Sequence, residues 1–271
     1  MSNQKIGVVI LTKNNNNVIE TCLDSFINNN TYKDLKFYIG DTGSTPDNLK
    51  RLREYLKSFP FPKELLQFKK WHFAKNHNYI IFNRVKEDLI LACNDDIELI
   101  NDPIHKMVTH MKPTVATVGA KLLFENNKIQ HGGHFYFFHK PEGVQNGYRF
   151  VTHRFLMDDN KELQNDEVPG NTFAFVLINK KIYKELKGIP EYYKVCFEDV
   201  EYCVNAVLKG YKHIFCGEAE CYHYESTSRK KLSTGTFDAD DGNRLIDVLN
   251  NYKFEHGMAK LKVLQKYAKS N

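Results

Sequence analysis

The stretch LILACNDDIEL, residues 89–99, reads as a buried strand that ends at three polar side chains and then turns apolar again. Adjacent carboxylates such as Asp95 and Asp96 repel each other and lose hydration where a strand leaves the core, so they stay ionised only beside a positive charge. A divalent cation is one source of that charge. The alternative is that Asn94 or Asp95 caps a helix, which the sequence predicts over residues 97–111.

The chain around this stretch alternates between strands and helices. Continuous apolar runs predict strands buried on both faces, and apolar residues on one helical face predict helices between them. The helix at 45–58 has Thr45 as its predicted N-cap and Pro46 at its first position. Such alternation predicts an α/β fold with a Rossmann-like, mixed but mainly parallel sheet and right-handed crossovers. The predicted strands are 6–12, 35–44, near 65–70 and 88–94, and the predicted helices are 18–30, 45–58 and near 74–86.

The second half of the chain is less regular. A helix at 198–210 is closed by Gly210 at the C′ position. The other predicted elements are strands at 114–124, 132–138 and 171–179, a loop over 139–165 and a late strand pair at 212–224. No internal repeat or proline-rich linker divides the chain. We therefore predict one domain over residues 1–237 with a C-terminal helical extension over 238–271.

Composition excludes several classes of protein. With 271 residues, of which 42% are hydrophobic, the chain can bury a sizeable core. No apolar run approaches the roughly 18 residues that span a bilayer, so a cytoplasmic protein is expected. The six cysteines form neither a CxxC pair nor a zinc spacing, which predicts reduced, mostly buried thiols. The net charge of +5 is mild, and the absence of a basic stripe with interleaved aromatics argues against nucleic acid.

The end of the chain is rich in lysine. Residues 252–271 contain five lysines and the single acidic residue Glu255. A solvated helix face explains this pattern, and a contact with a partner or with the anionic inner face of a membrane is the alternative.

Polar residues also follow the other predicted strands. In an open α/β sheet, ligands bind outside the carboxyl ends of the strands. Thr12 and Asn14 follow the first strand, Asp41 and Ser44 the second, and Asp95 the strand quoted above, so all should lie along one edge. Neither GxGxxG nor GxxxxGK[ST] is present, which argues against a classical dinucleotide site or P-loop. The residues left favour a nucleotide pocket built from side chains, with carboxylates that suit Mg²⁺ or Mn²⁺ together with substrate phosphates.

Eight segments, taken in order and spacing, resemble the family-2 glycosyltransferases of GT-A fold over roughly residues 5–230. Each segment alone is a weak indication, whereas the ordered set is specific. The segments are VVILTKNN, YIGDTGST, FAKNHN, LACNDDIEL, VGAKLLFENNKIQHGG, VPGNTFAFVLINKKIY, EDVEYCVNAVLKGY and CYHYESTSR.

The resemblance implies transfer of a sugar from a nucleotide diphosphate donor, for which a UDP-sugar is expected, to a glycan, lipid-linked or protein acceptor, with inversion. Asp96 would take the metal-binding place of the DxD motif, and His223 that of a further metal ligand. The motif begins here with Asn94, and Thr42 stands where a second Asp is frequent. The implied contacts with the nucleotide sugar fall on Thr12, Asn14, Asp41, Lys75, Asn76, Asn94, Asp95, Gly170, Asn171 and Arg229.

A second acidic pair, Glu198 and Asp199, opens the predicted helix at 198–210. Free N–H groups and the helix dipole stabilise carboxylates there, which is also the simpler explanation of the pair. An inverting displacement needs one base for the proton of the acceptor hydroxyl. The resemblance implies that Asp199 takes the place of the base in the family, and Glu198 is the second candidate. The pair His131 and His134, in HGGH, is interpreted as incidental and not as a metal site.

Two other functions use the same fold or the same metals. A catalytically silent nucleotide-sugar-binding or scaffolding protein would keep the fold, and the joint presence of Asp96, Asp199 and His223 argues against it. A nucleotidyltransferase would also use carboxylate-bound metal, but the segment LTKNNNN lacks the glycines of its phosphate loop.

Overall fold

A computed structural model describes residues 4–139, 148–224 and 239–255. The helices are α1 Asn16–Asn28, α2 Pro46–Ser58, α3 Phe73–Asn83, α4 Pro103–His110, α5 Lys180–Glu185, α6 Glu198–Leu208 and α7 Ala239–Glu255. The strands are β1 Ile6–Thr12, β2 Leu35–Asp41, β3 Lys63–Gln67, β4 Leu89–Asn94, β5 Ile97–Leu99, β6 Val115–Leu123, β7 Ile129–His131, β8 His134–His139, β9 Tyr148–His153, β10 Asp166–Val168, β11 Phe175–Asn179 and β12 Lys212–His223.

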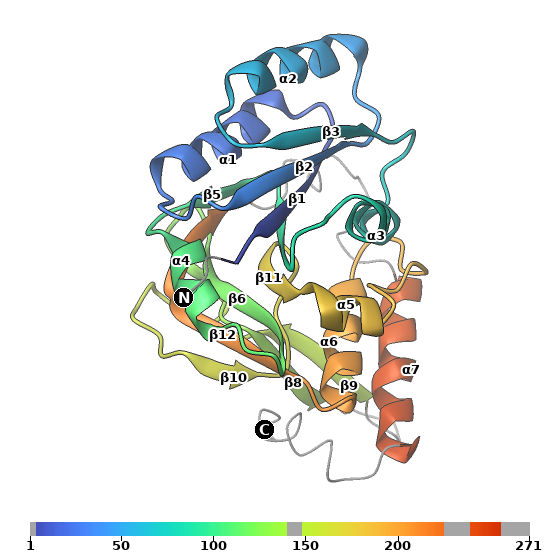
Figure 1. Cartoon of the computed structure of the whole chain (residues 1–271). Coiled ribbons are helices and arrows are strands. Elements are labelled where there is room, and N and C mark those ends of the chain that lie inside the picture. Colours follow the sequence, from blue (N-terminus) through green and yellow to red (C-terminus); the bar gives the residue numbers. More distant parts are fainter. Residues whose placement is uncertain (1–3, 140–147, 225–238, 256–271) are drawn as a thin grey trace.

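One mixed sheet forms the centre of the molecule (Figure 1). Its strand order is β10-β12-β6-β11-β4-β1-β2-β3, with β5 added on β12 and β7 added on β6. Strand β1 runs parallel to both β2 and β4, and β2 runs parallel to β3. Strand β11 lies antiparallel between β4 and β6. The predicted α/β architecture is confirmed. The N-terminal half of the sheet is parallel throughout, and the other half combines antiparallel pairs with the parallel pair of β6 and β12.

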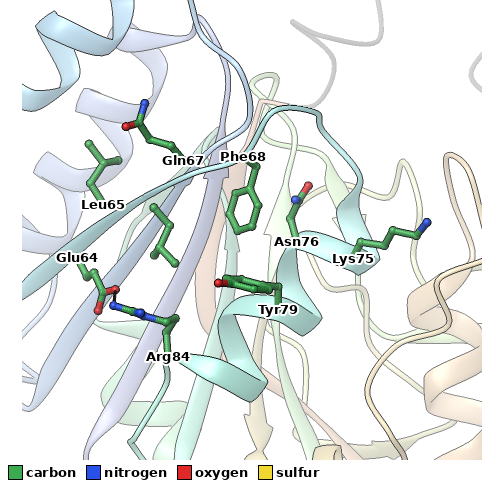
Figure 2. A pocket seen from close by; sticks show the side chains of 9 residues that line it. Glu64, Leu65, Gln67, Phe68, Lys75, Asn76, Tyr79 and Arg84 are labelled. Carbon is green, nitrogen blue, oxygen red and sulfur yellow. Dashed lines mark ion pairs between the residues drawn. The ribbon is translucent and has the colours of Figure 1, made fainter.

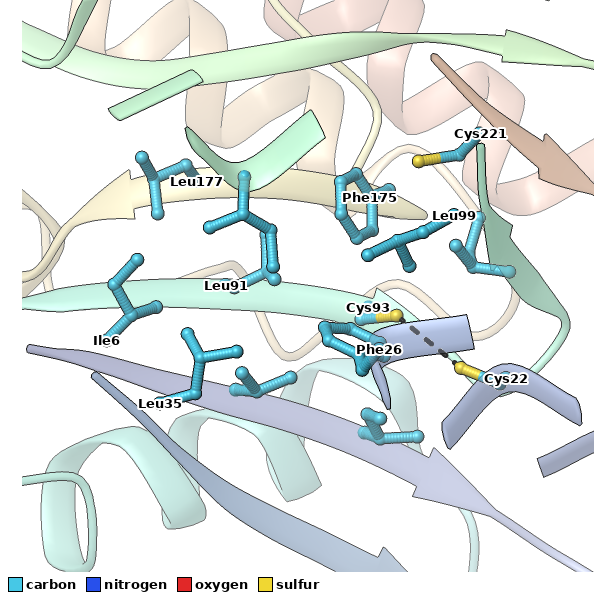
Figure 3. Packing of buried hydrophobic residues seen from close by; sticks show 14 of the residues in the cluster. Ile6, Cys22, Phe26, Leu35, Leu91, Cys93, Leu99, Phe175, Leu177 and Cys221 are labelled. Carbon is cyan, nitrogen blue, oxygen red and sulfur yellow. Dashed lines mark hydrogen bonds between the residues drawn. The ribbon is translucent and has the colours of Figure 1, made fainter. Parts of the chain in front are cut away.

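Helices cover both faces of the sheet, which explains why the first strand reads as one apolar run. Val8 and Ile10 of β1 belong to the cluster that includes α1, α2 and α4, whereas Val9 and Leu11 face α3, α5 and α6. Figure 3 shows the first cluster, in which Phe26 of α1 lies over the strands. Its ring meets that of Phe37 edge to face at 5.0 Å. Each such side chain, when fully buried, contributes about 1.5–3 kcal/mol to stability.

A smaller layer covers the C-terminal side of the molecule. Strands β8 and β9 pair as an antiparallel ribbon, so the loop predicted over 139–165 is wrong where β9 lies. Leu245 and Leu249 of α7 are buried with Val151 of β9 and with Val204 of α6. The carboxylate of Asp241, at the start of α7, accepts hydrogen bonds from the backbone N–H groups of residues 194, 195 and 196, just before α6. Helix α7 is therefore bonded to the segment that leads into α6.

The helix predicted over 97–111 is wrong for its first six residues. Residues 97–99 form strand β5, and the helix α4 begins only at Pro103. Pairing of β5 with the end of β12, where Cys221 faces Leu99, overrides the helical pattern. Asn94 and Asp95 therefore cap no helix, and that alternative is excluded. The strand pair predicted at 212–224 is also wrong, because β12 is one strand with a register shift between Cys216 and Glu220.

Several local predictions are confirmed. Thr45 is the N-cap of α2, Pro46 follows it, and Gly210 adopts a positive φ of 90° just past α6. Cys22, Cys93, Cys203, Cys216 and Cys221 are buried thiols, and the Sγ atoms of Cys22 and Cys93 lie 4.0 Å apart (Figure 3).

Some sequence features lie outside the described residues. These are Arg229 and most of the lysine-rich segment, from residue 256 onward. Among the helices that the structure does describe, none combines the length and the apolar character that a membrane span requires.

Candidate functional site

The ends of the parallel strands meet at one edge of the sheet, as predicted. Strands β1 and β4 are neighbours, and the Thr12 hydroxyl donates a hydrogen bond of 2.7 Å to Oδ2 of Asp95. The N–H of Thr42 donates to the carbonyl of Thr12 at 2.9 Å. Asn14 connects the same two turns, since its N–H donates to Ser44 Oγ at 2.8 Å and its Oδ1 accepts from the N–H of Thr45 at 2.8 Å. Hydrogen bonds therefore join the turns that follow β1, β2 and β4.

Asp41 closes the turn after β2. Its carboxylate is buried, with 2% exposure, and accepts from the N–H of Ser44 at 3.2 Å and from that of Gly43 at 3.4 Å. The carbonyl of Asp41 accepts from the N–H of Phe68 at 2.7 Å. The turn is thus held in place before any ligand binds.

Asp95 is the inner carboxylate of the acidic pair. Burial raises its pKa to about 7, the hydrogen bond from Thr12 opposes that rise, and the neighbouring charge of Asp96 adds to it. The main cause is thus the loss of hydration that the sequence predicted for carboxylates at a strand end, and the predicted repulsion between them contributes less. A cation near the pair would favour the ionised form of Asp95.

Asp96 and His223 converge on one point. Oδ1 of Asp96 is buried without a hydrogen-bond partner, and it lies 3.3 Å from Nε2 of His223. The other ring nitrogen, Nδ1, lies 2.5 Å from Oε1 of Gln130, so Nδ1 carries the proton and a neutral ring presents a lone pair at Nε2. With a neutral ring, two lone pairs face each other and a divalent cation between them would satisfy both, whereas a protonated ring would donate from Nε2 to Asp96 directly. Two atoms that bind the same small divalent cation at right angles stand about 3.0 Å apart, so this pair fits such an ion.

The pairing of β5 with β12 builds this arrangement. His223 is the last residue of β12 and lies opposite Ile97, the first residue of β5. The N–H of Tyr224 donates to the carbonyl of Asp96 at 3.1 Å. Nδ2 of Asn94 lies 3.3 Å from Nε2 of His223. Residues more than 120 positions apart in the sequence are therefore fixed beside each other by backbone hydrogen bonds.

The second acidic pair stands at the start of α6, as predicted. Oδ2 of Asp199 accepts from the N–H of Phe173 at 3.1 Å, and Oδ1 accepts from the N–H of Val200 at 2.8 Å. Each oxygen keeps a second lone pair. Asp199 is half-buried, whereas Glu198 is buried, with 7% exposure. The carboxylate of Asp199 is therefore held in one orientation against the loop at 170–173.

That loop also contains Gly170 and Asn171. A Cβ atom on Gly170 would lie 2.6 Å from both Cys203 Cβ and His134 Nδ1, so glycine is needed here for close packing against α6. Asn171 is fully buried, and its Nδ2 donates to Thr117 Oγ1 at 3.0 Å and to the carbonyl of Ile214 at 3.1 Å. In this structure the side chain of Asn171 thus points among the strands, where it supports the loop.

Lys75 and Asn76 lie in the first turn of α3 and line a hollow of about 520 Å³ (Figure 2). Phe68 and Tyr79 form its aromatic part, with ring centroids 5.6 Å apart. Oδ1 of Asn76 accepts from the N–H of His72 at 2.7 Å, and Figure 2 shows Lys75 pointing away from the other lining residues. Because Phe68 is bonded to Asp41, the hollow adjoins the turn after β2. It contains neither Asp96 nor His223.

The HGGH segment forms a buried histidine cluster. The ring centroids of His131 and His134 lie 5.5 Å apart, and those of His131 and His153, in β9, lie 4.7 Å apart. Burial holds the pKa of both His131 and His134 well below the usual value, so both are neutral at pH 7. Nε2 of His131 accepts from the N–H of Thr172 at 3.3 Å. The interpretation of this segment as incidental missed the contact with the 170–173 loop.

Within the described residues, another group brings three metal-binding atom types within 4.8 Å of one another: His110, Cys216 and Glu218. Nδ2 of Asn165 donates toward both His110 Nε2, at 3.3 Å, and Glu218 Oε1, at 3.0 Å. An amide hydrogen-bond network thus already satisfies these two atoms. Glu218 is also exposed, so the group resembles surface hydrogen bonding more than a metal centre.

The chain matches the family model "Glycosyl transferase family 2" over residues 7–187. Among curated proteins it is 25% identical over 228 residues to the protein y4gI of Sinorhizobium fredii, and 23% identical over 242 residues to the O-antigen biosynthesis protein RfbC of Myxococcus xanthus. Each match covers 83% of this chain. The chain spans only 25% and 18% of the length of these two relatives.

Two solved structures share the fold at 13% sequence identity. One is GalNAc-T7 with UDP, GalNAc and Mn²⁺, with a TM-score of 0.67 over 84% of this chain and 45% of that one. The other is the mannosyltransferase PcManGT of Pyrobaculum calidifontis with GDP-Man and Mn²⁺, with a TM-score of 0.60 over 98% of this chain and 74% of that one. The GT-A fold inferred from the sequence resemblance is confirmed.

Proposed function

The chain belongs to glycosyl transferase family 2, and from that premise we propose that it is a metal-dependent, inverting enzyme. It moves a hexosyl or N-acetylhexosaminyl group from a nucleoside diphosphate sugar, UDP-linked, to an acceptor hydroxyl. The observation that carries this proposal is the approach of Asp96 Oδ1 to His223 Nε2 at 3.3 Å, at the strand ends where ligands bind in such sheets.

Asp96 and His223 would hold the divalent cation, Mn²⁺ or Mg²⁺. When bound there, the ion would supply positive charge against the leaving diphosphate. The support is the chemistry of the pair: one carboxylate oxygen without a hydrogen-bond partner, one imidazole lone pair, and a second ring nitrogen already bonded to Gln130. The structural neighbours that carry Mn²⁺ are consistent with this choice of ion.

The nucleoside binds along the joined strand ends. Thr12, Asn14 and Asp41 line the turns nearest β1 and β2, and Lys75 and Asn76 extend this surface at the start of α3. Asn94 and Asp95 lie between this surface and the cation, on the ribose side. Gly170 and Asn171 shape the loop that faces the donor sugar, the former through packing and the latter through its bond to Thr117. Arg229 is proposed from the sequence alone to reach the diphosphate.

Asp199 acts as the base. The acceptor oxygen attacks the anomeric carbon as the bond from that carbon to the diphosphate oxygen breaks, and the acceptor proton passes to a free lone pair of Asp199. The fixed orientation of its carboxylate, held by two backbone N–H groups, supports this role because a positioned base must not rotate away. Glu198 is the second candidate for the base.

The products and place of the reaction are proposed from the relatives. RfbC acts in O-antigen biosynthesis, which supports a role in surface glycan or glycoconjugate assembly, with a glycan, lipid-linked or protein acceptor. We place the reaction in the cytoplasm, and the lysine-rich end at the inner face of the membrane. Residues 1–237 form the catalytic domain and 238–271 the helical extension, whose helix α7 packs against it.

A direct assay tests the function. The protein is incubated with a panel of UDP-, GDP- and dTDP-sugars, with and without Mn²⁺, and release of the nucleoside diphosphate is measured. Turnover with at least one donor that depends on the metal and is lost in Asp96→Ala is the expected result. Tight nucleotide binding without turnover of any donor would instead support the silent binding protein.

A further inference from the structure

We propose that strand β7, Ile129–His131, is the positioning element of the transfer centre, with Gln130 orienting His223 and His131 orienting the loop that holds Asp199. The inference rests on the proposed function, since it concerns the proposed metal ligand and the proposed base. It assigns roles to two residues of the segment KIQHGG that contact no reacting atom themselves.

Gln130 is bonded to His223 in two directions. Its Oε1 lies 2.5 Å from Nδ1 of the ring, and its Nε2 donates to the carbonyl of His223 at 3.3 Å. Only the amide nitrogen can donate to a carbonyl, so the second bond fixes which end of the amide faces the ring. Oε1 must then accept, and Nδ1 of His223 must carry the proton. The lone pair of a neutral ring is left at Nε2, on the side of Asp96.

The burial of this pair makes the orientation firm. Gln130 has 4% exposure and His223 has 7%, so water does not compete for these bonds. Partners that bond the second ring nitrogen of a metal-binding histidine fix its tautomer and its plane, and their loss typically lowers metal affinity 10–100-fold. Gln130 has the position and the chemistry of such a partner.

His131 performs the corresponding task for the base. Its Nε2 accepts from the N–H of Thr172, and the next N–H along the chain, that of Phe173, donates to Asp199 Oδ2. Because Nε2 accepts, the proton of a neutral His131 ring is on Nδ1. This Nδ1 lies 2.5 Å from Nδ1 of His153 and is the donor of that bond. Burial and the neighbouring histidines hold the pKa of His131 well below the usual value, so Nε2 remains an acceptor at neutral pH. Consecutive backbone N–H groups are thus held by His131 and by the base.

A strand is suited to this double task because consecutive side chains point to opposite faces. The side chain of Gln130 is hydrogen-bonded to His223 of β12, and the side chain of His131 is hydrogen-bonded to the 170–173 loop. The strand itself is fixed to β6, through the pairing of Ile129 with Leu123 and of His131 with Leu122. The proposed metal ligand and the loop that holds the proposed base are therefore both positioned by contacts with one three-residue strand.

A purely structural role for these buried residues is the competing explanation, and matched pairs of variants separate the two. Gln130→Met keeps the length but removes both the acceptor for Nδ1 and the donor to the His223 carbonyl, whereas Gln130→Glu keeps the acceptor and loses only the donor. His131→Asn keeps a polar group at the place of Nδ1 but removes the acceptor for Thr172, whereas His131→Gln keeps an acceptor at the place of Nε2. Gln164→Met, at an exposed position, is the control for the Gln→Met change.

Mn²⁺ affinity in the presence of UDP is measured by calorimetry, kcat at saturating Mn²⁺ by product release, and Tm by thermal unfolding. We expect Gln130→Met to weaken Mn²⁺ binding 10–100-fold while kcat largely recovers at saturating metal, and Gln130→Glu to stay within about threefold of wild type. We expect His131→Asn to lower kcat about tenfold or more with unchanged Mn²⁺ affinity, and His131→Gln to restore most of it.

Unchanged Mn²⁺ affinity in Gln130→Met, or equal losses of kcat in His131→Asn and His131→Gln, would overturn the corresponding assignment. A parallel loss of Tm and activity in both members of a pair would mean that the residue only packs. His223→Ala is measured alongside. If that variant binds Mn²⁺ as the wild type does, the proposed metal site itself is wrong, and this outcome is distinct from a failure of the positioning strand.

Discussion

Replacing Asp199 with Asn tests whether the carboxylate of this residue acts as the base or only stabilises the start of α6. The side chain keeps its size, and the proposed metal site is untouched, so affinity for UDP with Mn²⁺ should persist. Loss of basicity should lower the initial rate of transfer by a factor on the order of 10² or more, which is the scale for a positioned general base.

The structure also predicts a cost in stability for the same variant. Both carboxylate oxygens accept a backbone N–H, from Phe173 at 3.1 Å and from Val200 at 2.8 Å. An Asn side chain has one acceptor oxygen, so one of these N–H groups must face the NH₂ group without a partner. An unsatisfied buried donor costs about 1–3 kcal/mol. For a chain of this size the Tm should fall by several degrees, since each kcal/mol shifts it by about 2–4 °C.

The stability cost cannot imitate the loss of rate. A domain with about 5–15 kcal/mol of stability remains almost fully folded at 25 °C after losing 1–3 kcal/mol. Initial rates at 25 °C, UDP affinity by calorimetry and Tm are therefore measured on the same preparations, with Glu198→Gln as the matched carboxylate-to-amide control. Near-normal turnover in Asp199→Asn together with an inactive Glu198→Gln would exchange the two roles. Near-normal turnover in both would refute a base at this helix start.

Three further predictions concern the metal, pH and packing. Asp96→Ala should abolish the enhancement of UDP binding by Mn²⁺ and His223→Ala should reduce it less, as calorimetry with and without the metal will show; unchanged enhancement would remove the residue from the site. Burial lowers the pKa of His213 to about 4, below its unfolded value of about 6.5, so its contribution to stability is complete above pH 6.5 and is lost toward pH 4, by about 3 kcal/mol. Urea unfolding across that range should be less pH-dependent in His213→Gln, and an unaltered slope would contradict the assignment. Gly170→Ala should cost about 1–3 kcal/mol in urea unfolding, because the new Cβ would lie 2.6 Å from Cys203 and His134, and wild-type stability would mean that the loop shifts freely.

Local chemistry and periodicity were sufficient to predict the parallel half of the fold and the edge where polar residues gather. The apolar run of β1 reflects burial on both faces, and the strand-end rule correctly placed Thr12 beside Asp95. These features depend on residues near one another in sequence or on one general rule of sheet topology. The assigned roles of the individual site residues stay predictions.

The features that the sequence did not predict depend on contacts between residues far apart in the chain. Residues 97–99 continue a helical pattern, but hydrogen bonds to β12 make them a strand, and that strand brings His223 to Asp96. No sequence pattern pointed to Gln130, because its proposed role depends on the ring of His223, which is 93 positions away in the chain. The resemblance implied that the loop with Asn171 faces the donor sugar; the amide of Asn171 reaches Thr117 and Ile214, a contact that no local pattern indicates.

The bonds from Asp241 to the backbone of residues 194–196 have a consequence for synthesis on the ribosome. A chain translated as far as residue 224 already contains all the strands that the structure describes in the central sheet, and its N-terminal units can fold in the order in which they emerge. The segment before α6 then still has three N–H groups without their carboxylate, and the apolar face of α6 lacks Leu245 and Leu249. Helix α6, which carries Asp199, is therefore secured only after α7 has left the exit tunnel. A stalled or shortened chain would have the sheet without a firmly seated carboxylate at the place of the proposed base.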